Sequence, residues 1–166
     1  MEKFMIIQVF TNGYFRYIIT SLLIATKNKF TEAITMSNIE EAKEFFGKDV
    51  YATKTTGIEI LEAEPGYAKC ALKIEDKHKN ALGQVMGGVF FVMADYAFAI
   101  ASNFKQPPTV TQTSQIVYLS PVKGTTLYAE TEKIRGGKKT CFYKVSIYDD
   151  TGTLNAYVTI SGYVIG

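Results

Sequence analysis

The most apolar stretch of the chain runs from Val89 to Ala101 and contains a single charged residue, Asp95. It is shorter than the roughly 20 residues that cross a bilayer. A helix that is apolar on every face and lies outside a membrane is buried on all sides. The pattern therefore predicts a central helix that the rest of the chain wraps.

Alternation of apolar and polar residues on both sides of this helix predicts strands. Before the helix, strands are expected at 57–62 and 67–74, joined by the turn tripeptide Glu64-Pro65-Gly66. After it, four strands rich in Thr, Val, Ile and Tyr are expected at 109–119, 125–135, 138–148 and 154–165. This order predicts an α+β fold in which one antiparallel sheet closes over one helix.

The first 35 residues differ from the rest. Two apolar runs, 5–10 and 14–25, flank Asn12-Gly13, a hairpin-type turn signal, and neither resembles a membrane span or a signal peptide. Ser37 and Glu40 have capping-box spacing, which predicts a short helix from about Ile39 to Phe46 that ends at Gly47. We expect the functional domain to comprise residues 36–166. Residues 1–35 are then an extension that is either dispensable or the result of a translation start assigned too far upstream.

The composition is that of a globular domain with a sizeable core: 166 residues, 47% hydrophobic and 20% charged. A formal net charge of +2 does not predict nucleic-acid binding. Cys70 and Cys141 fall on strand positions expected to be buried, which favours reduced core residues in a cytoplasmic protein and leaves a disulfide between them open. One histidine and two separated cysteines argue against a zinc site.

The motifs of several enzyme classes are absent from the sequence. There is no phosphate-binding P-loop, no Gly-x-Gly-x-x-Gly fingerprint and no Gly-x-Ser-x-Gly elbow. A Ser-His-Asp triad would require His78, which lies in a polar loop and is expected at the surface.

Asp95 has two interpretations, because an unpaired charge is costly to bury. It is either a structural residue that is hydrogen-bonded to its neighbours or a functional residue that faces a wet cavity. Gly87-Gly88 precede it by two helical turns, and Gly88, Phe91 and Asp95 fall on one helix face. The first N–H groups of a helix have no partner within it. Free N–H groups and a carboxylate on one face suit an acyl-transfer site.

Residues 40–166 resemble the hotdog fold, in which a curved antiparallel sheet wraps a central helix, and most closely the PaaI-like acyl-CoA thioesterase family. The resemblance rests on an Asn-x-x-Gly-x-x-x-Gly-Gly run, an Asp seven residues beyond the second Gly of the pair, and two later segments. These residues are Asn80, Gly83, Gly87-Gly88, Asp95 to Ala99, Tyr118-Leu119-Ser120-Pro121 and Gly136-Gly137-Lys138. Residues 1–35 have no counterpart in the pattern.

The resemblance implies roles in thioester hydrolysis. Asp95 is implied as nucleophile or general base, and the backbone N–H of Gly87 as the donor that polarises the thioester carbonyl. Asn80 is implied to border the site opposite Asp95, and Thr111 to position water. In this family the two sides of the site come from different subunits, which implies a homodimer and in some cases a homotetramer.

The resemblance also implies residues that bind coenzyme A or the acyl group: Gly88 and Met86 at the helix start, and Arg135, Gly137 and Lys138 at a Gly-Gly hairpin. The hairpin has a second interpretation as a solvated charged turn. Met86 departs from the pattern, since many family members have histidine there, and methionine neither donates a hydrogen bond nor carries a charge.

The sequence thus predicts a cytoplasmic acyl-CoA or aryl-CoA thioester hydrolase that needs no metal and no redox cofactor and binds neither nucleic acid nor membrane. The alternative is a non-catalytic hotdog module that binds acyl-CoA, which Met86 favours and Asp95 disfavours. A hotdog dehydratase ranks last, because it requires a catalytic histidine near the helix start. The choice between acyl and aryl substrates stays open.

Overall fold

The computed structural model describes residues 13–165. The chain divides into two compact units between Ser37 and Asn38, and the second unit holds the sheet and the candidate site. Helix α2 (Gly13–Phe46) runs across this boundary and includes the predicted apolar run 14–25. The apolar run 5–10 and Asn12, the first residue of the predicted Asn12-Gly13 turn, lie outside the described residues. That residues 1–35 are dispensable stays a prediction.

The predicted helix start at Ser37 is wrong, because α2 continues through it. No proline or glycine occurs between Gly13 and Phe46 to interrupt the helix. The hydroxyls of Thr31 and Thr35 each donate to the carbonyl four residues earlier, at 2.9 Å, as threonines do in a helix interior. The predicted end is confirmed, since α2 stops at Phe46.

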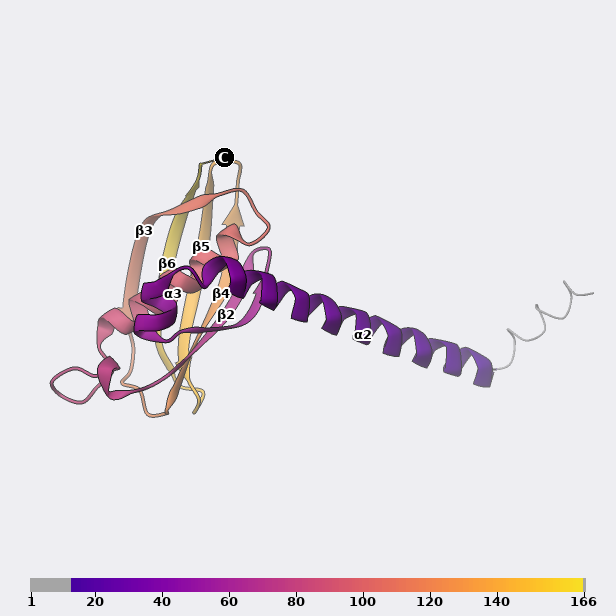
Figure 1. The fold of residues 1–166 in the computed structure, drawn as a ribbon, viewed down its shortest axis with the longest axis horizontal. Helices are drawn as coiled ribbons and strands as arrows, with labels where there is room; N and C mark the ends of the chain where they lie inside the picture. Colours follow the sequence, from indigo (N-terminus) through magenta and orange to yellow (C-terminus); the bar gives the residue numbers. More distant parts are fainter. Residues whose placement is uncertain (1–12, 166) are drawn as a thin grey trace, which may run out of the picture. The chain divides into compact units, whose positions relative to one another are not determined.

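Six antiparallel strands form one sheet in the order β1-β2-β4-β5-β6-β3 (Figure 1). All six match predicted strands, with ends that differ by a few residues. The strands are β1 (Glu59–Glu64), β2 (Tyr67–Lys73), β3 (Thr109–Tyr118), β4 (Thr126–Gly136), β5 (Thr140–Asp149) and β6 (Leu154–Val164). Strands β1 and β3 form the two edges of the sheet.

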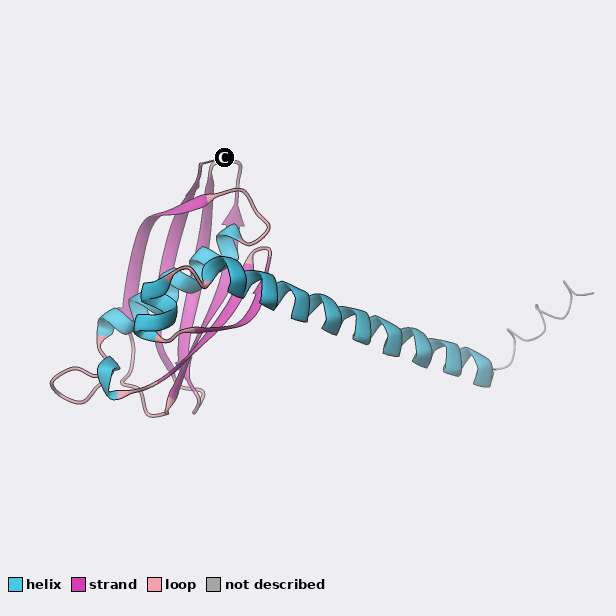
Figure 2. Cartoon of the chain, viewed as in Figure 1, coloured by secondary structure: helices cyan, strands magenta, loops and turns pink. Residues whose placement is uncertain are grey.

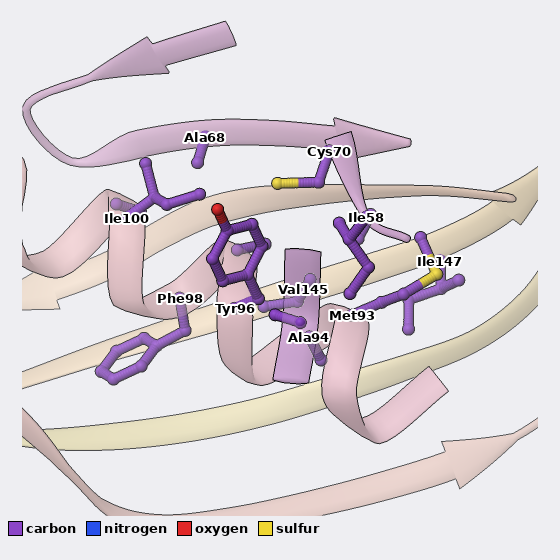
Figure 3. Packing of buried hydrophobic residues seen from close by; sticks show 14 of the residues in the cluster. Ile58, Ala68, Cys70, Met93, Ala94, Tyr96, Phe98, Ile100, Val145 and Ile147 are labelled. Carbon is purple, nitrogen blue, oxygen red and sulfur yellow. The ribbon is translucent and has the colours of Figure 1, made fainter. Parts of the chain in front are cut away.

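Helix α3 (Gly87–Asn103) packs against the sheet and contacts all six strands, which confirms the predicted central helix (Figure 2). Met93, Ala97 and Ile100 of this helix are fully buried. Figure 3 shows side chains from α3, β2 and β5 converging in one apolar cluster; among those labelled are Met93, Tyr96, Ile100, Ala68, Cys70, Val145 and Ile147.

The prediction that α3 is buried on all sides is wrong for one stripe of the helix. Gly88, Phe91 and Asp95 are exposed, and 39% of the Phe91 surface remains accessible. These positions are three and four residues apart, so they lie above one another on one face. The remaining faces of α3 are covered by the sheet and by η1 (Tyr51–Thr56), a π-helical turn before β1.

The two cysteines are free and buried, as predicted for reduced core residues. Burial raises the pKa of the Cys70 thiol to about 12, so this thiol stays protonated and unreactive at neutral pH.

Asp149 organises the segment that follows β3. Its carboxylate is buried and accepts hydrogen bonds from the backbone N–H groups of Lys123 (2.9 Å), Thr151 (3.1 Å) and Thr153 (3.2 Å). Burial alone raises the pKa of Asp149, but the hydrogen bonds from the Thr151 hydroxyl and from these N–H groups lower it more, so the pKa lies well below its usual range. The ionised form therefore holds the β3–β4 connection against the turn after β5.

We predict that Asp149→Asn lowers the free energy of unfolding at pH 7 by roughly 2–3 kcal/mol, because a charged acceptor with several buried donors is lost. A carboxylate with a depressed pKa stabilises the fold above its unfolded pKa of about 3.9 and loses this effect as pH falls through the folded value. Chemical denaturation between pH 7 and pH 2 measures both effects.

The wild-type stability should therefore fall more steeply below pH 4 than that of Asp149→Asn. The neighbouring Asp150 provides a matched control, because it is exposed and its carboxylate accepts hydrogen bonds from the backbone N–H and the hydroxyl of Thr125. Asp150→Asn should cost less at pH 7. Parallel pH curves for wild type and Asp149→Asn would contradict the assignment.

Candidate active site

A short loop leads into α3 and fixes the position of its first residue. The backbone N–H of Met86 donates to the carbonyl of His78 at 2.8 Å. Within the loop, the side-chain oxygen of Asn80 accepts the N–H groups of Leu82 (2.9 Å) and Gln84 (3.1 Å). Gly83 has φ +75°, a conformation that glycine adopts without strain. The side-chain oxygen of Asn80 thus shapes the loop, and its amide nitrogen has no hydrogen-bond partner among residues 13–165.

Gly87 is the first residue of α3, and Met86 before it has extended backbone angles. No described residue accepts a hydrogen bond from the Gly87 N–H, as expected at a helix N-terminus. The carbonyl of Gly87 accepts the hydroxyl of Tyr118, the last residue of β3, at 3.0 Å. A Cβ at this position would lie 2.8 Å from that hydroxyl, so glycine allows the close approach. Gly87 therefore presents a free, positioned N–H donor.

Asp95 lies two turns further along the same helix. Its carboxylate is exposed and accepts a hydrogen bond from the hydroxyl of Thr111 on β3 at 3.1 Å. The structure thus brings together two of the predicted site residues. The partner hydroxyl orients one carboxylate oxygen and leaves the other available to a ligand or a water molecule.

Gly87 and Asp95 are too far apart to hold one carbonyl group. They are eight residues apart on α3, which at 1.5 Å per residue is about 12 Å along the helix axis. A donor and a nucleophile or base that act on the same carbonyl must each lie within about 3.5 Å of it. Within one chain, the two groups form two half-sites.

The predicted coenzyme A hairpin lies at the other end of α3. Gly137 and Lys138 border a pocket with Ser102 and Gln106, near the C-terminal end of the helix. Arg135 and Lys138 are exposed. The chain does not bring these residues to Gly87, and their role in binding coenzyme A stays a prediction.

Two pockets flank the start of α3. We call the first the η1 pocket; its lining includes Tyr51 and Thr56 of η1, His78, and Met86, Gly88 and Val92 at the start of α3. We call the second the β3 pocket; its lining includes Gln84, Gly87, Phe90, Tyr118 and Leu119. The terminal carbon of Met86 would lie 2.8 Å from a Cβ on Gly88, so the Met86 side chain covers Gly88.

His78 is buried, and the expectation that it lies at the surface is wrong. Its Nδ1 accepts the N–H of Glu75 at 2.9 Å, which places the ring proton on Nε2, and Nε2 donates to the carbonyl of Thr56 at 2.7 Å. The polar residues around His78 in the sequence gave no sign of this contact, because Thr56 is 22 residues away.

Tyr118 is the functional position that sequence reasoning missed. It was noted only as part of the Tyr118-Leu119-Ser120-Pro121 segment, yet its hydroxyl bonds to Gly87 and its ring packs edge-on against Phe90 at 5.9 Å. An aromatic residue at the end of a strand carries no signal for such a contact.

The described part of the chain has no group of three or more His, Cys, Asp or Glu side chains placed to hold a metal ion. Nor does any helix in it combine the length and the apolar character that a membrane span requires.

Known proteins are similar to this chain in sequence over the region that holds the site. A sequence model of the thioesterase superfamily matches residues 82–156, which include Gly87, Asp95 and Thr111. Human acyl-coenzyme A thioesterase 13 is 30% identical over 103 residues, covering 60% of this chain and 74% of that protein. Acyl-coenzyme A thioesterase PaaI of Escherichia coli is 32% identical over 95 residues, covering 57% and 68%.

Solved structures share the fold. The TT0310 protein of Thermus thermophilus superposes with a TM-score of 0.64 at 27% identity, over 68% of this chain and 96% of that one. The PaaI protein of E. coli superposes with a TM-score of 0.72 at 24% identity, over 78% and 95%.

This chain belongs to the thioesterase superfamily and has its hotdog fold. The resemblance to PaaI-like thioesterases and the predicted enzyme class, a thioester hydrolase, are confirmed.

We predict that Asn80→Asp and Asn80→Ala separate the two possible roles of Asn80. Aspartate keeps the acceptor oxygens for Leu82 and Gln84, so the melting temperature should stay near that of the wild type. Alanine removes the acceptor and should cost about 1 kcal/mol. If the amide nitrogen binds substrate, both variants lose activity; full activity in Asn80→Asp would restrict Asn80 to shaping the loop.

Proposed function

We propose that this chain is an acyl-CoA thioesterase in which Asp95 and the backbone N–H of Gly87 act on the same thioester carbonyl. The observation that carries the proposal is the pairing of an exposed carboxylate, held by Thr111, with an unpaired N–H at the start of the same helix. The named activities of the human and E. coli relatives support acyl-CoA as the substrate.

The N–H of Gly87 donates a hydrogen bond to the carbonyl oxygen of the thioester and stabilises the negative charge that develops on that oxygen during attack. Asp95 then acts in one of two ways. Its carboxylate attacks the carbonyl carbon to form an anhydride that water cleaves, or it takes a proton from the water that attacks. In both cases the C–S bond breaks, and the products are the free acid and coenzyme A.

The proposal includes a homodimer with two sites at the interface. The separation of about 12 Å between Gly87 and Asp95 supports it, because a second copy can bring its Asp95 to the Gly87 of the first. The exposed stripe of Gly88, Phe91 and Asp95 and the edge strand β3 offer a surface for this contact. Assembly into a tetramer is part of the same proposal.

Water is the only co-reactant that this reaction needs, so we propose hydrolysis without metal or redox cofactor. The phosphates of coenzyme A are assigned to the hairpin of Arg135, Gly137 and Lys138, where the cationic side chains of Arg135 and Lys138 are exposed and suit phosphate. Free, buried Cys70 and Cys141 are compatible with the reducing cytoplasm, where we place the enzyme.

We predict that Asp95→Asn lowers kcat for acyl-CoA hydrolysis by 100-fold or more, on the order of what general acid–base catalysis contributes. Thr111→Val should cause a smaller loss, because the carboxylate remains but is no longer oriented. Release of free thiol from acyl-CoA measures both rates. Glu132→Gln is the matched control, since Glu132 is an exposed carboxylate on β4 outside the site.

If the wild type and Asp95→Asn both bind acyl-CoA and neither releases thiol, the protein is the non-catalytic binding module. Equal rates in the wild type and in Asp95→Asn would remove Asp95 from the mechanism.

We predict that Gly87→Pro lowers kcat by about 100- to 1000-fold relative to Gly87→Ala, the loss typical for one oxyanion donor. Proline deletes the N–H, is favoured at the first position of a helix, and suits the extended backbone of Met86 before it. Both variants place a Cβ against Tyr118, so alanine controls for that strain. Equal rates in the two variants would exclude the N–H as the donor.

Mixing the two inactive variants tests the interface. If each site combines Gly87 of one copy with Asp95 of the other, a dimer of one Gly87→Pro chain and one Asp95→Asn chain has one intact site. Subunit exchange at equal ratio should then restore about a quarter of the wild-type activity. No recovery, with exchange demonstrated, would contradict the shared site.

A further inference from the structure

The hydroxyl of Tyr118 donates to a carbonyl that already has a partner within its helix. Gly87 is the first residue of α3, and in an α-helix the carbonyl of residue i accepts the N–H of residue i+4, here Phe91. The Tyr118 hydroxyl is therefore a second donor to the Gly87 carbonyl, at 3.0 Å. Because Tyr118 is 53% exposed, this hydrogen bond can break without leaving a buried polar group unpaired.

The fold nevertheless holds this hydroxyl close to the start of α3. Its ring packs edge-on against the ring of Phe90, which is buried, at 5.9 Å between centroids. A Cβ on Gly87 would lie 2.8 Å from the hydroxyl oxygen, so only glycine allows the approach without a shift. Tyr118 and Gly87 also line the same pocket, the β3 pocket. The ring contact and the missing Cβ together keep the hydroxyl beside Gly87.

One oxygen atom can accept hydrogen bonds from both the Gly87 N–H and the Tyr118 hydroxyl. The nitrogen and the Cβ position of one residue are about 2.5 Å apart, so the Tyr118 oxygen lies at most about 5.3 Å from the Gly87 nitrogen. Donors that share an acceptor, at about 2.9 Å for an N–H and about 2.7 Å for a hydroxyl, can be up to about 5.6 Å apart. A carbonyl oxygen on the Gly87 N–H is therefore within reach of the Tyr118 hydroxyl.

The hydroxyl can change its acceptor by rotation of its proton alone. The O–H group turns about the C–O bond, so the tyrosine ring need not move. The Gly87 carbonyl is a neutral acceptor, whereas the thioester oxygen is charged after attack, and hydrogen bonds to charged acceptors are about twice as strong. The exchange is thus favourable in the transition state and not in the bound substrate, which raises kcat without changing substrate binding.

We propose that Tyr118 is a further catalytic residue, whose hydroxyl is a second donor to the oxyanion held by the Gly87 N–H. This inference rests on the proposed function. The hydroxyl turns from the Gly87 carbonyl to the oxyanion during attack on the thioester, and it turns back when the C–S bond breaks. Tyr118 keeps its proton throughout and only donates a hydrogen bond.

Tyr118→Phe tests the proposal, because it removes the hydroxyl and keeps the ring against Phe90. For the acyl-CoA that the wild type hydrolyses fastest, kcat should fall by about tenfold or more, towards the 100- to 1000-fold loss typical of one oxyanion donor. KM should stay within about twofold of the wild-type value, since the hydrogen bond forms only in the transition state. The melting temperature should also stay near that of the wild type, because no buried group loses its partner.

Tyr157→Phe is the matched control. Tyr157 lies on β6 next to Val158, which is buried, and successive side chains of a strand point to opposite faces. The Tyr157 hydroxyl therefore lies on the face of the sheet away from α3, and its removal should leave kcat unchanged. Equal kcat values in the wild type and Tyr118→Phe would overturn the proposal.

Replacing Tyr118 with 3-fluorotyrosine separates a catalytic role from a positioning role. The fluorine makes the hydroxyl a stronger hydrogen-bond donor and leaves the ring in place. Donation to the oxyanion should then raise kcat above the wild-type value at neutral pH. A hydroxyl that only holds the Gly87 carbonyl would give no increase, so an unchanged or lower kcat would overturn the catalytic role.

Failure of this inference can be told apart from failure of the proposed function. If the wild type hydrolyses no acyl-CoA, or if Asp95→Asn is as active as the wild type, the proposed function fails and this inference with it. If hydrolysis depends on Asp95 and Tyr118→Phe keeps the wild-type kcat, only the role of Tyr118 fails.

Discussion

The burial of α3 against the sheet is the constraint on which the rest of the domain depends. All six strands contact this helix, and its fully buried residues, such as Met93 and Ala97, leave no space between helix and sheet. One stripe of the helix is left uncovered, and Asp95 lies on that stripe. Because the other faces of α3 are covered, the carboxylate of this helix lies on one exposed surface. There it can contact water, a substrate or a second copy of the chain.

Most of the domain could be predicted from the sequence, because its signals are local. The apolar run from Val89 to Ala101 has only one stable environment outside a membrane, and the strands after it alternate or are bounded by Gly and Pro turns. The extent of α2 could not be predicted from the capping-box pattern at Ser37. The same Ser-x-x-Glu spacing also occurs inside a continuous helix, where the backbone N–H groups of these residues have partners within the helix.

The contacts that were missed are long-range. The bond of His78 to Thr56 and that of Tyr118 to Gly87 join residues 22 and 31 positions apart. Both depend on how segments distant in the sequence pack beside the start of α3, which no periodicity in the sequence records. Asp95 and Gly87 could be singled out because a lone carboxylate and a glycine pair are unusual in an apolar helix, whereas Thr111 was singled out through the resemblance to PaaI-like thioesterases. The hydrogen bond between Thr111 and Asp95 could not be predicted, because it depends on how β3 packs against α3.

Edge strand β3 connects the two halves of the site. Two of its side chains bond to α3, Thr111 to Asp95 and Tyr118 to Gly87. Displacement of this strand along the helix would disturb both the carboxylate and the donor. As an edge strand, β3 also carries backbone groups that a neighbouring chain can pair with. The same element can therefore orient both reacting groups and respond to association of two copies.

On the opposite side of Gly87, His78 connects the wall of the η1 pocket to the helix start. Its ring bonds to Thr56 at the end of η1, and its carbonyl accepts the N–H of Met86, the residue before Gly87. The ring of His78 is buried, and its two nitrogens hold one acceptor contact and one donor contact. His78 thus links the wall of the η1 pocket with the position of the N–H that we assign to the thioester carbonyl.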